Sequence, residues 1–233
     1  MTRSLNEEVQ SLDLEENDLL YRIRRGSRIV WDEDWTTLTI YESPDGIESA
    51  VDKFIPHSLD IERLGFKHAR HFNILGLEAL SRISDRVARV MVDGETRVLK
   101  IARFEHEIGI LELEVSIYAR LASVDFSLAP KFIGYVYEEV ETRVIGFLME
   151  DVSGPTPGIE DLDACKETVG LLHDSGIIHR DLNKYNMFMT ESGIKIFDFG
   201  HSAIQENMEL EAEKEIITLA QNLQDESGTG ERS

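Results

Sequence analysis

The sequence predicts an α+β protein with two lobes, in which a β-rich N-terminal lobe is followed by a reduced helical C-terminal lobe. The clearest strand signal lies at 86–104, where two alternating apolar runs flank Asp93-Gly94, a strong two-residue turn signal. A second signal is the segment 152–158, VSGPTPG, whose Pro and Gly residues interrupt the pattern as a linker does. Beyond this linker, apolar residues recur mainly at helical spacing. A cleft between two such lobes is the natural place for a ligand.

Further strands are expected on both sides of the hairpin. Residues 19–42 contain β-branched and aromatic residues in short runs and predict two or three strands or a hairpin. Residues 43–75 are ambiguous, apart from a turn at the letters ESPDG. The segments 131–139 and 142–151 predict two more strands, so most of the sheet is expected in the N-terminal lobe.

Three helices are expected. The segment 105–124 predicts an acidic amphipathic helix, and 161–176 predicts a second helix that ends at Gly176 as a C-terminal cap. The third spans 208–223, and we expect its inner face to pack under the loop that contains Asp181. The apolar positions of the first helix are Ile110, Leu113, Ile117 and Leu121. The expected inner face of the third helix is Leu210, Ile217, Ala220 and Leu223.

These elements divide the chain into four segments. An acidic tail at 1–17 and a polar tail at 224–233 are expected to be disordered, because neither can bury enough apolar surface to order itself. Between the tails we expect an N-lobe at 18–150, with extra N-terminal strands, and a reduced C-lobe at 151–223 with the polar motifs described below.

Composition narrows the classes of protein. The chain has 233 residues, of which 42% are hydrophobic, so a core of ordinary size can form. The formal net charge of −21 disfavours nucleic acid and anionic membranes, so neither is expected as a partner. The single cysteine, Cys165, cannot form an internal disulfide, which favours a reducing compartment. The chain begins without a signal peptide and contains no apolar run of ~18 residues, so we expect a soluble, intracellular, cytoplasmic protein.

Two short polar motifs stand beside apolar stretches in the expected C-lobe: HRDLNKYN at 179–186 and FDFG at 197–200. Asp181 and Asn186 are five residues apart, and Asp198 follows Asn186 by twelve. Carboxylate and amide oxygens are hard ligands that suit Mg²⁺, with a nucleotide supplying the other ligands. A further Asp on the same loop can accept a hydroxyl proton, and phosphoryl transfer needs little else beyond positive charge near the phosphates.

These motifs resemble those of protein kinases. The His-Arg-Asp at 179–181 with Asn186 is similar to the catalytic loop, and the Asp-Phe-Gly at 198–200 is similar to the metal-binding motif. Upstream, the letters RVLKIA resemble the motif of the third strand and mark Lys100, and Glu114 lies fourteen residues further on, in the pattern of the helix that pairs with this Lys. The resemblance covers about residues 75–223 and implies a two-lobe protein-kinase-like fold.

The resemblance also implies roles for these residues, with ATP and Mg²⁺ as cofactors. Asp181 would position the acceptor hydroxyl or act as the base, while Asn186 and Asp198 would hold Mg²⁺. Lys100 would hold the α- and β-phosphates, and Glu114 would orient Lys100. The rival acidic residues on the same helix are Glu105, Glu107 and Glu112.

The strand and hinge that hold adenine are identified by resemblance with GFLMEDVSG, so backbone groups from Glu150 to Val152 would bind the base. The implied function is ATP-dependent transfer of the γ-phosphate to a hydroxyl of a Ser/Thr residue. The acceptor is expected to be a protein or a small hydroxylated molecule, and a protein partner that completes the C-lobe is left open.

The sequence also departs from the kinase pattern. The hairpin is preceded by ALSRISDRV at 79–87 rather than by a glycine-rich loop. Asn183 stands where Ser/Thr kinases usually carry Lys, and Tyr185 resembles the corresponding residue of atypical kinases of the RIO type. Only 33 residues follow Gly200, with no long activation segment and no set of peptide-docking helices. The chain is therefore similar to minimal atypical kinases, or to kinase-like proteins of fungi.

Two alternatives remain. A nucleotide-binding pseudokinase or interaction module is favoured by the missing glycine loop, whereas the intact Lys, Asp, Asn and Asp set opposes it. A small-molecule kinase of the aminoglycoside or choline type has Gly where Arg180 stands and a large helical insertion before the catalytic loop. The 28 residues from Asp151 to His179 leave no room for that insertion. We expect His179 and Arg180 to have structural roles and Cys165 to have no chemical role.

Overall fold

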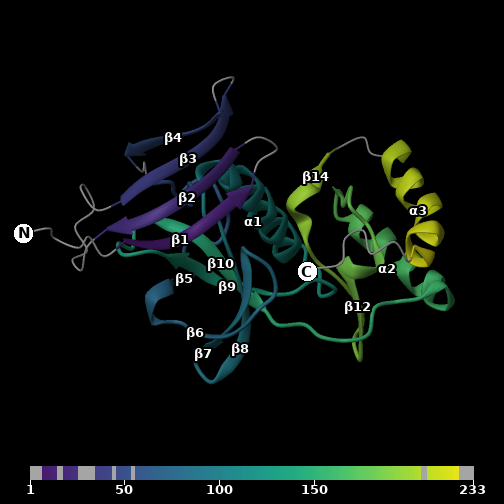
Figure 1. The fold of residues 1–233 in the computed structure, drawn as a ribbon. Coiled ribbons are helices and arrows are strands. Elements are labelled where there is room, and N and C mark those ends of the chain that lie inside the picture. The colour runs from purple at the N-terminus through teal and green to yellow at the C-terminus, as the bar shows by residue number, and fades with distance from the viewer. Residues whose placement is uncertain are drawn as a thin grey trace, which may run out of the picture. The chain divides into compact units, whose positions relative to one another are not determined.

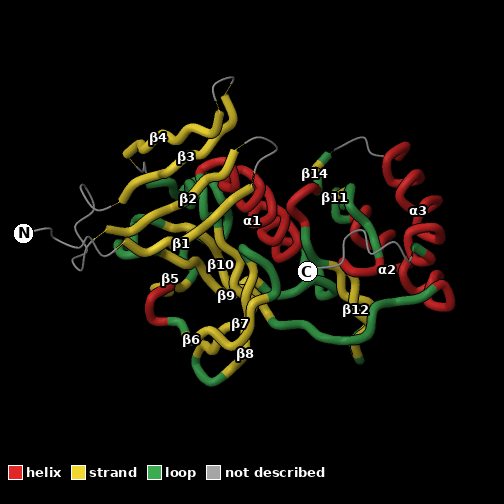
Figure 2. The backbone as a smooth tube through the Cα atoms, viewed as in Figure 1, coloured by secondary structure: helices red, strands yellow, loops and turns green. Residues whose placement is uncertain are grey.

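The computed structural model divides the chain into two compact units, residues 1–56 and 57–233, which are described separately. Figures 1 and 2 show the elements by chain order and by type. For the first unit only the backbone is described, except at Glu48 and Pro56. The residues whose placement is described are 7–14, 18–25, 35–43, 46–53, 56–205 and 209–225.

The first unit contains a four-stranded antiparallel sheet in the order β1-β2-β3-β4. Its strands are β1 (Glu7–Leu14), β2 (Asp18–Arg25), β3 (Trp35–Ser43) and β4 (Gly46–Lys53). The prediction of two or three strands over 19–42 is confirmed by β2 and β3. The disordered tail expected at 1–17 is wrong for the residues of β1. The register of β1 and β2 sets Glu7 and Glu8 opposite Arg25 and Arg24, a cross-strand pattern that composition does not reveal.

The second unit begins with a six-stranded sheet in the order β5-β9-β10-β8-β7-β6. The expected hairpin is confirmed as β7 and β8, and its turn residues Asp93 and Gly94 have φ of 52° and 83°, as a tight hairpin turn requires. The two further predicted strands are β9 and β10. The strands are β5 (Arg70–Asn73), β6 (Glu78–Arg82), β7 (Val87–Val92), β8 (Glu95–Ile101), β9 (Phe132–Tyr137) and β10 (Val144–Glu150).

Helix α1 (Ile108–Ser123) packs against this sheet and confirms the first predicted helix. Its buried face differs in phase from the apolar stripe seen in the sequence, because Ile110 and Leu113 are only partly buried. The face instead includes Glu114, which is fully buried. The buried residues of α1 are Leu111, Glu114, Val115, Ile117, Tyr118 and Leu121.

The described residues of the C-terminal lobe form helices α2 and α3 and two short strand pairs, β11–β14 and β12–β13, and Figure 2 shows helix and strand side by side in this lobe. Helix α2 (Leu162–Asp174) is followed by Gly176 with φ of 81°, so the predicted glycine cap is confirmed. The last helix is α3 (Glu209–Gln224). The strands are β11 (Ile177–Ile178), β12 (Met187–Thr190), β13 (Gly193–Ile196) and β14 (Ala203–Ile204). Single 3-10 turns occur at Ile74–Gly76, Glu105–Glu107, Ile159–Asp161, Lys184–Asn186 and Phe199–His201.

The inner face predicted for α3 is wrong in two of its positions. Leu210 and Ile217 are 83% and 68% exposed, whereas Leu219 and Leu223 are buried in the core. In this orientation of α3, Glu215 accepts the backbone N–H of His179 while Leu210 and Ile217 face outward. A strand-rich lobe followed by a helical lobe is nevertheless the α+β, two-lobe arrangement that the sequence predicts. No helix among the described residues is long and apolar enough to cross a membrane.

Candidate active site

The structure brings Lys100, Glu114 and Asp198 together from three elements. Lys100 lies on β8, Glu114 on α1, and Asp198 directly after β13. The Lys100 ammonium contacts both carboxylate oxygens of Glu114, at 2.9 and 2.6 Å, and Oδ1 of Asp198 at 2.6 Å. Lys100 and Glu114 are buried, while the Asp198 side chain is 33% exposed. The buried Lys100 ammonium is therefore paired with the buried Glu114 on one side and with the partly exposed Asp198 on the other.

The electrostatics of Lys100 follow from this pairing. Burial by itself would lower the pKa of the ammonium, but the charges of Glu114 and Asp198 outweigh it and hold the pKa above its ordinary value. Lys100 is thus a permanent cation at the site. The rival residues contact other groups, since Glu112 accepts the backbone N–H of Asp60 and Glu107 lies at Arg103. The geometry therefore pairs Glu114, and not its rivals, with Lys100.

The twelve-residue spacing between Asn186 and Asp198 is explained by the β12–β13 hairpin. Its strands pair from Met187–Ile196 to Thr190–Gly193, so the residues at its open end lie side by side. The backbone N–H of Phe197 donates to the carbonyl of Asn186 at 3.1 Å. Asp198 adopts φ of 71° and ψ of 60°, a left-handed conformation that turns the chain after the hairpin. A short local hairpin thus places both proposed metal ligands at one edge.

Asp181 is linked directly to Asn186. The Asn186 amide nitrogen donates to the backbone carbonyl of Asp181 at 2.8 Å and to its Oδ2 at 3.2 Å. Asn186 is buried, so its orientation is held by these bonds. Asn183 adds a local cap, because its side-chain oxygen accepts the N–H of Tyr185 and its amide reaches the Asp181 carbonyl. Asn183 therefore has a turn-forming role in place of the Lys usual there.

His179 is a buried scaffold residue, as expected. Its Nε2 lies 3.0 Å from the carbonyl of Phe197, and Nδ1 accepts the N–H of Asp181 at 3.3 Å. These contacts assign the neutral form with the proton on Nε2. Burial holds the pKa of His179 below its ordinary value. The ring also packs against Phe199, 5.3 Å between centroids, and Phe199 packs against Tyr118 of α1 at 5.4 Å.

The hinge region lies at the end of β10. A small cavity of about 190 Å³ under it is lined by residues that include Val98, Met149, Glu150 and Val152. The side chain of Glu150 contacts Lys195 at 2.9 Å, so its carboxylate has a structural partner. Burial alone would raise the pKa of Glu150, but the hydrogen bonds from Lys195 and from the Lys131 backbone, together with the charges of both lysines, outweigh it, and the pKa lies below its ordinary value. The backbone N–H of Glu150 also has a partner, since it donates to the Lys131 carbonyl at 2.8 Å.

Sequence reasoning missed one ion pair at the same cavity. Arg89 on β7 contacts both carboxylate oxygens of Asp151 through Nε, at 3.1 and 3.0 Å, and both residues line the cavity under the hinge. The cleft-facing side of β7 is marked by Val87, which stands opposite Lys100 in the hairpin register. Arg89 lies two residues after Val87 on β7, so the alternation of a strand places both on the same side of the sheet. The sequence indicates this side for Arg89, but it does not indicate that Asp151 is the partner.

In the turn that stands in place of the glycine-rich loop, backbone amides form hydrogen bonds within the turn itself. The N–H groups of Ile83 and Ser84 both donate to the Val87 carbonyl, at 2.9 and 3.0 Å, and Val87 N–H lies 3.4 Å from the Ser84 carbonyl. Asp85 at the tip contacts Arg103 at 3.1 Å, which ties the turn to the segment between β8 and α1. Amides bonded in this way are not offered to phosphates, so the departure seen in the sequence is structural as well.

The donor set fits a divalent cation that a nucleotide helps to hold. Asn186 uses its amide nitrogen for Asp181, which directs the amide oxygen to serve as a ligand, and Asp198 offers a partly exposed carboxylate. No group of three or more His, Cys, Asp or Glu in the described part of the chain is placed to hold a metal by itself. Mg²⁺ commonly binds through one or two protein oxygens together with phosphates and water.

A β-rich lobe, a helical lobe and this constellation between them define a protein-kinase-like domain. Residues 149–221 match the family model of the RIO domain. Over 88 residues the chain is 32% identical to the KEOPS complex subunit Bud32 of Pyrococcus abyssi (strain GE5 / Orsay). That alignment covers 33% of this chain and 40% of the Bud32 protein. Over these residues the chain is similar to atypical protein kinases, and the similarity to RIO kinases predicted from the catalytic loop is confirmed.

Proposed function

We propose that the protein is an ATP-dependent phosphotransferase that transfers the γ-phosphate to a hydroxyl group. The observation that carries this proposal is the position of Lys100 between Glu114 and Asp198, while Asn186 is bonded to Asp181. These groups supply the positive charge, the metal ligands and the hydroxyl-positioning carboxylate that phosphoryl transfer requires. The matches to the RIO domain and to Bud32 support the same class of reaction.

Each residue has one task in this proposal. The backbone from Glu150 to Val152 contacts the base, and Lys100 holds the α- and β-phosphates. Asn186 and Asp198 hold Mg²⁺, whose charge neutralises the phosphate oxygens when it is bound. Catalysis then depends on placement and electrostatics more than on covalent chemistry.

Asp181 orients the acceptor hydroxyl and accepts its proton. We propose a Ser/Thr hydroxyl as the acceptor and a cytoplasmic setting, in keeping with the composition. A protein partner is also proposed, and the similarity to Bud32, a subunit of the KEOPS complex, supports it. The chain spans two fifths of that relative's length, so its partners enter here as proposals only.

A nucleotide-binding pseudokinase is the second candidate. It is favoured by the turn at Ile83–Val87, whose amides are bonded within the turn. Without backbone donors over the phosphates, binding of the nucleotide depends more heavily on Lys100 and the metal. The two candidates share the binding site and differ in turnover.

The first prediction tests the metal site. Mg²⁺-ATP at ~100 times its dissociation constant is expected to stabilise the protein by about 2.7 kcal/mol against unfolding. Asp198→Asn removes one of the two protein ligands and should abolish the Mg²⁺-dependent part of this stabilisation. The measurement is a thermal-shift titration with ATP, with and without Mg²⁺.

Asp163→Asn is the matched control, because Asp163 is exposed on α2 and is not one of the proposed site residues. It should keep the full Mg²⁺ effect. If Mg²⁺ makes no difference to the wild-type shift, the metal site is not formed by Asn186 and Asp198, and the proposed reaction loses its basis.

A further inference from the structure

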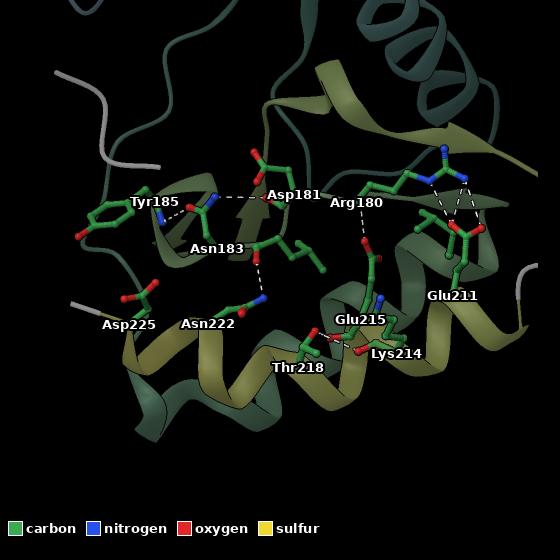
Figure 3. Close-up of a pocket in the computed structure, with 12 residues that line it drawn as sticks. Arg180, Asp181, Asn183, Tyr185, Glu211, Lys214, Glu215, Thr218, Asn222 and Asp225 are labelled. Carbon is green, nitrogen blue, oxygen red and sulfur yellow. Dashed lines mark hydrogen bonds and ion pairs between the residues drawn. The ribbon is translucent and has the colours of Figure 1, made fainter. Parts of the chain in front are cut away.

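Two acidic side chains of helix α3, one turn apart, form hydrogen bonds to Arg180, the residue before Asp181 (Figure 3). Glu215 accepts the backbone N–H of His179 at 3.2 Å and that of Arg180, and its Oε2 also lies 2.8 Å from Nε2 of His173. Glu211 accepts from the Arg180 guanidinium, with Nε–Oε2 at 3.1 Å and Nη2–Oε1 at 3.3 Å. Arg180 is thus held by its main chain and by its side chain at the same time.

The backbone of Arg180, which these hydrogen bonds hold, is strained. Arg180 has φ of 65°, in the left-handed region that residues with long side chains rarely adopt. Such a conformation persists where its surroundings over-determine it. Because Asp181 is the next residue, the direction of its carboxylate depends on the conformation of Arg180.

A cavity of about 480 Å³ lies between this loop and α3 (Figure 3). Beside the cavity, Leu182 of the loop belongs to the same apolar core as Leu219 and Leu223 of α3, and polar contacts link the loop to the helix as well. Besides the two glutamates, the Asn222 amide donates to the Leu182 carbonyl at 2.7 Å. The residues that line the cavity are Ile178, Arg180, Asp181, Leu182, Asn183, Tyr185, Glu211, Lys214, Glu215, Thr218, Asn222 and Asp225.

We propose that Glu211 is a positioning residue for Asp181, acting through the guanidinium of Arg180. Glu215 secures the backbone N–H groups, and Glu211 keeps the Arg180 side chain from pulling the chain out of its left-handed conformation. In this proposal, the carboxylate of Glu211 holds the loop at Arg180, so no phosphate group added to another segment is needed to hold it. This inference rests on the proposed function, because it concerns the placement of the proposed base.

Exposure separates a positioning role from a purely stabilising one. The Arg180 and Glu211 side chains are 41% and 46% exposed, so the pair contributes little to global stability. A displacement of about 1 Å in a catalytic group, by contrast, can slow a reaction ~100-fold. Loss of Glu211 is therefore expected to affect the chemical step far more than the stability.

The experiment uses the full chain with Glu211→Gln, and with Glu213→Gln as the matched control. Glu213 is exposed, lies on the same helix and undergoes the same chemical change. Three quantities are measured: the Mg²⁺-ATP dissociation constant, the single-turnover rate of γ-phosphate release, and hydrogen exchange of the amides at 179–183. For Glu211→Gln we expect a dissociation constant within about twofold of wild type, as for an interaction that acts on the transition state alone. The rate should fall by roughly tenfold or more, and the amides should exchange about two to five times faster.

Two further variants test the route through the guanidinium. Arg180→Lys keeps the charge but loses the planar fork, so it should reproduce most of the loss of rate. In a cycle with Arg180→Gln, the double variant with Glu211→Gln should be no slower than either single variant, because the two residues act as one unit.

The outcomes are distinct. Equal rates and equal exchange for Glu211→Gln and Glu213→Gln, or additive losses in the cycle, would overturn the positioning role. If wild-type turnover does not exceed that of Asp181→Asn, the proposed function fails instead. The exchange measurement then still decides whether Glu211 holds the loop. Faster exchange of the amides at 179–183 in Glu211→Gln supports this role, and unchanged exchange refutes it.

Discussion

Individual residues at this site are defined by how their buried charges are paired. Lys100 and Glu114 are buried together, and the attraction between their charges offsets part of the cost of removing each from water. Asn186 and His179 are buried polar groups whose hydrogen bonds run to the backbone of the same two motifs. Substitutions here consequently act on stability and on ligand binding at once, and measurements must separate the two.

The second prediction concerns Lys100 and Glu114. Lys100→Ala removes the ammonium from the phosphates and should weaken Mg²⁺-ATP binding by about 1.5–3 kcal/mol, the range of a hydrogen bond to a charged group. Glu114→Gln should weaken it less, because Asp198 still contacts Lys100 at 2.6 Å. Calorimetric titration of folded variants measures both, with exposed Glu105→Gln as the control. A larger effect of Glu114→Gln than of Lys100→Ala contradicts this order.

The third prediction follows from His179. Its pKa in the folded protein lies below the ordinary value of 6.5, so below about pH 6.5 the unfolded chain binds a proton that the folded protein does not. The free energy of unfolding should therefore fall as the pH drops from 7.5 to 5.5. His179→Gln should reduce this slope, whatever it does to stability at pH 7.5. Urea unfolding at several pH values tests it, with exposed His201→Gln as the control, and an unchanged slope would show that other groups dominate.

Single elements show how far a local pattern reaches. The β7–β8 and β12–β13 hairpins pair as their turn signals and motif spacing indicate, because a short hairpin is fixed by nearby residues. Helix α3 is different. Its apolar residues predict that a helix exists, but Glu215 and Asn222 bind the catalytic loop and decide which face turns inward.

The fourth prediction tests that corrected face. Leu219→Ala should lower the free energy of unfolding by about 2–5 kcal/mol, because Leu219 is fully buried and its loss leaves a cavity. Leu210→Ala should change it by less than about 0.5 kcal/mol, because Leu210 is 83% exposed. Chemical denaturation of both variants measures the difference. Equal losses would mean that α3 packs with the face suggested by its sequence.

At the scale of the whole molecule, both lobes of the unit 57–233 contribute to the site. The N-lobe supplies Lys100, Glu114 and the hinge, and the C-lobe supplies the catalytic loop and the β12–β13 hairpin. Between the Asp-Phe-Gly motif and α3, the described residues 201–205 contain the end of a 3-10 turn and the short strand β14.

The fifth prediction concerns turnover. The isolated chain should phosphorylate generic protein substrates poorly and should show slow ATP hydrolysis or autophosphorylation at most. Radiolabel transfer from ATP to a panel of proteins and small hydroxylated molecules tests this, with Asp181→Asn as the blank. Robust transfer to unrelated peptides would contradict it, and transfer to a small molecule would favour that class of kinase. Mg²⁺-dependent binding without any transfer would favour the pseudokinase.

The sequence by itself determined the order of elements, the two polar motifs and the spacing of Asp181, Asn186 and Asp198. These depend on turn residues and short hairpins, whose physics is local. It also singled out Glu114 by distance along the chain from Lys100, and the structure places the two in contact.

Only the tertiary structure decided which partners the polar side chains take. The carboxylate of Glu150 pairs with Lys195, Arg89 with Asp151, and Glu211 with Arg180, over sequence separations of 31 to 62 residues. A periodic pattern records which residues share a face, but the partner across a gap depends on how distant elements pack. For that reason only the folded structure shows which face of α3 is buried and which glutamates contact Arg180, because burial and charge pairing depend on the packing of the whole fold.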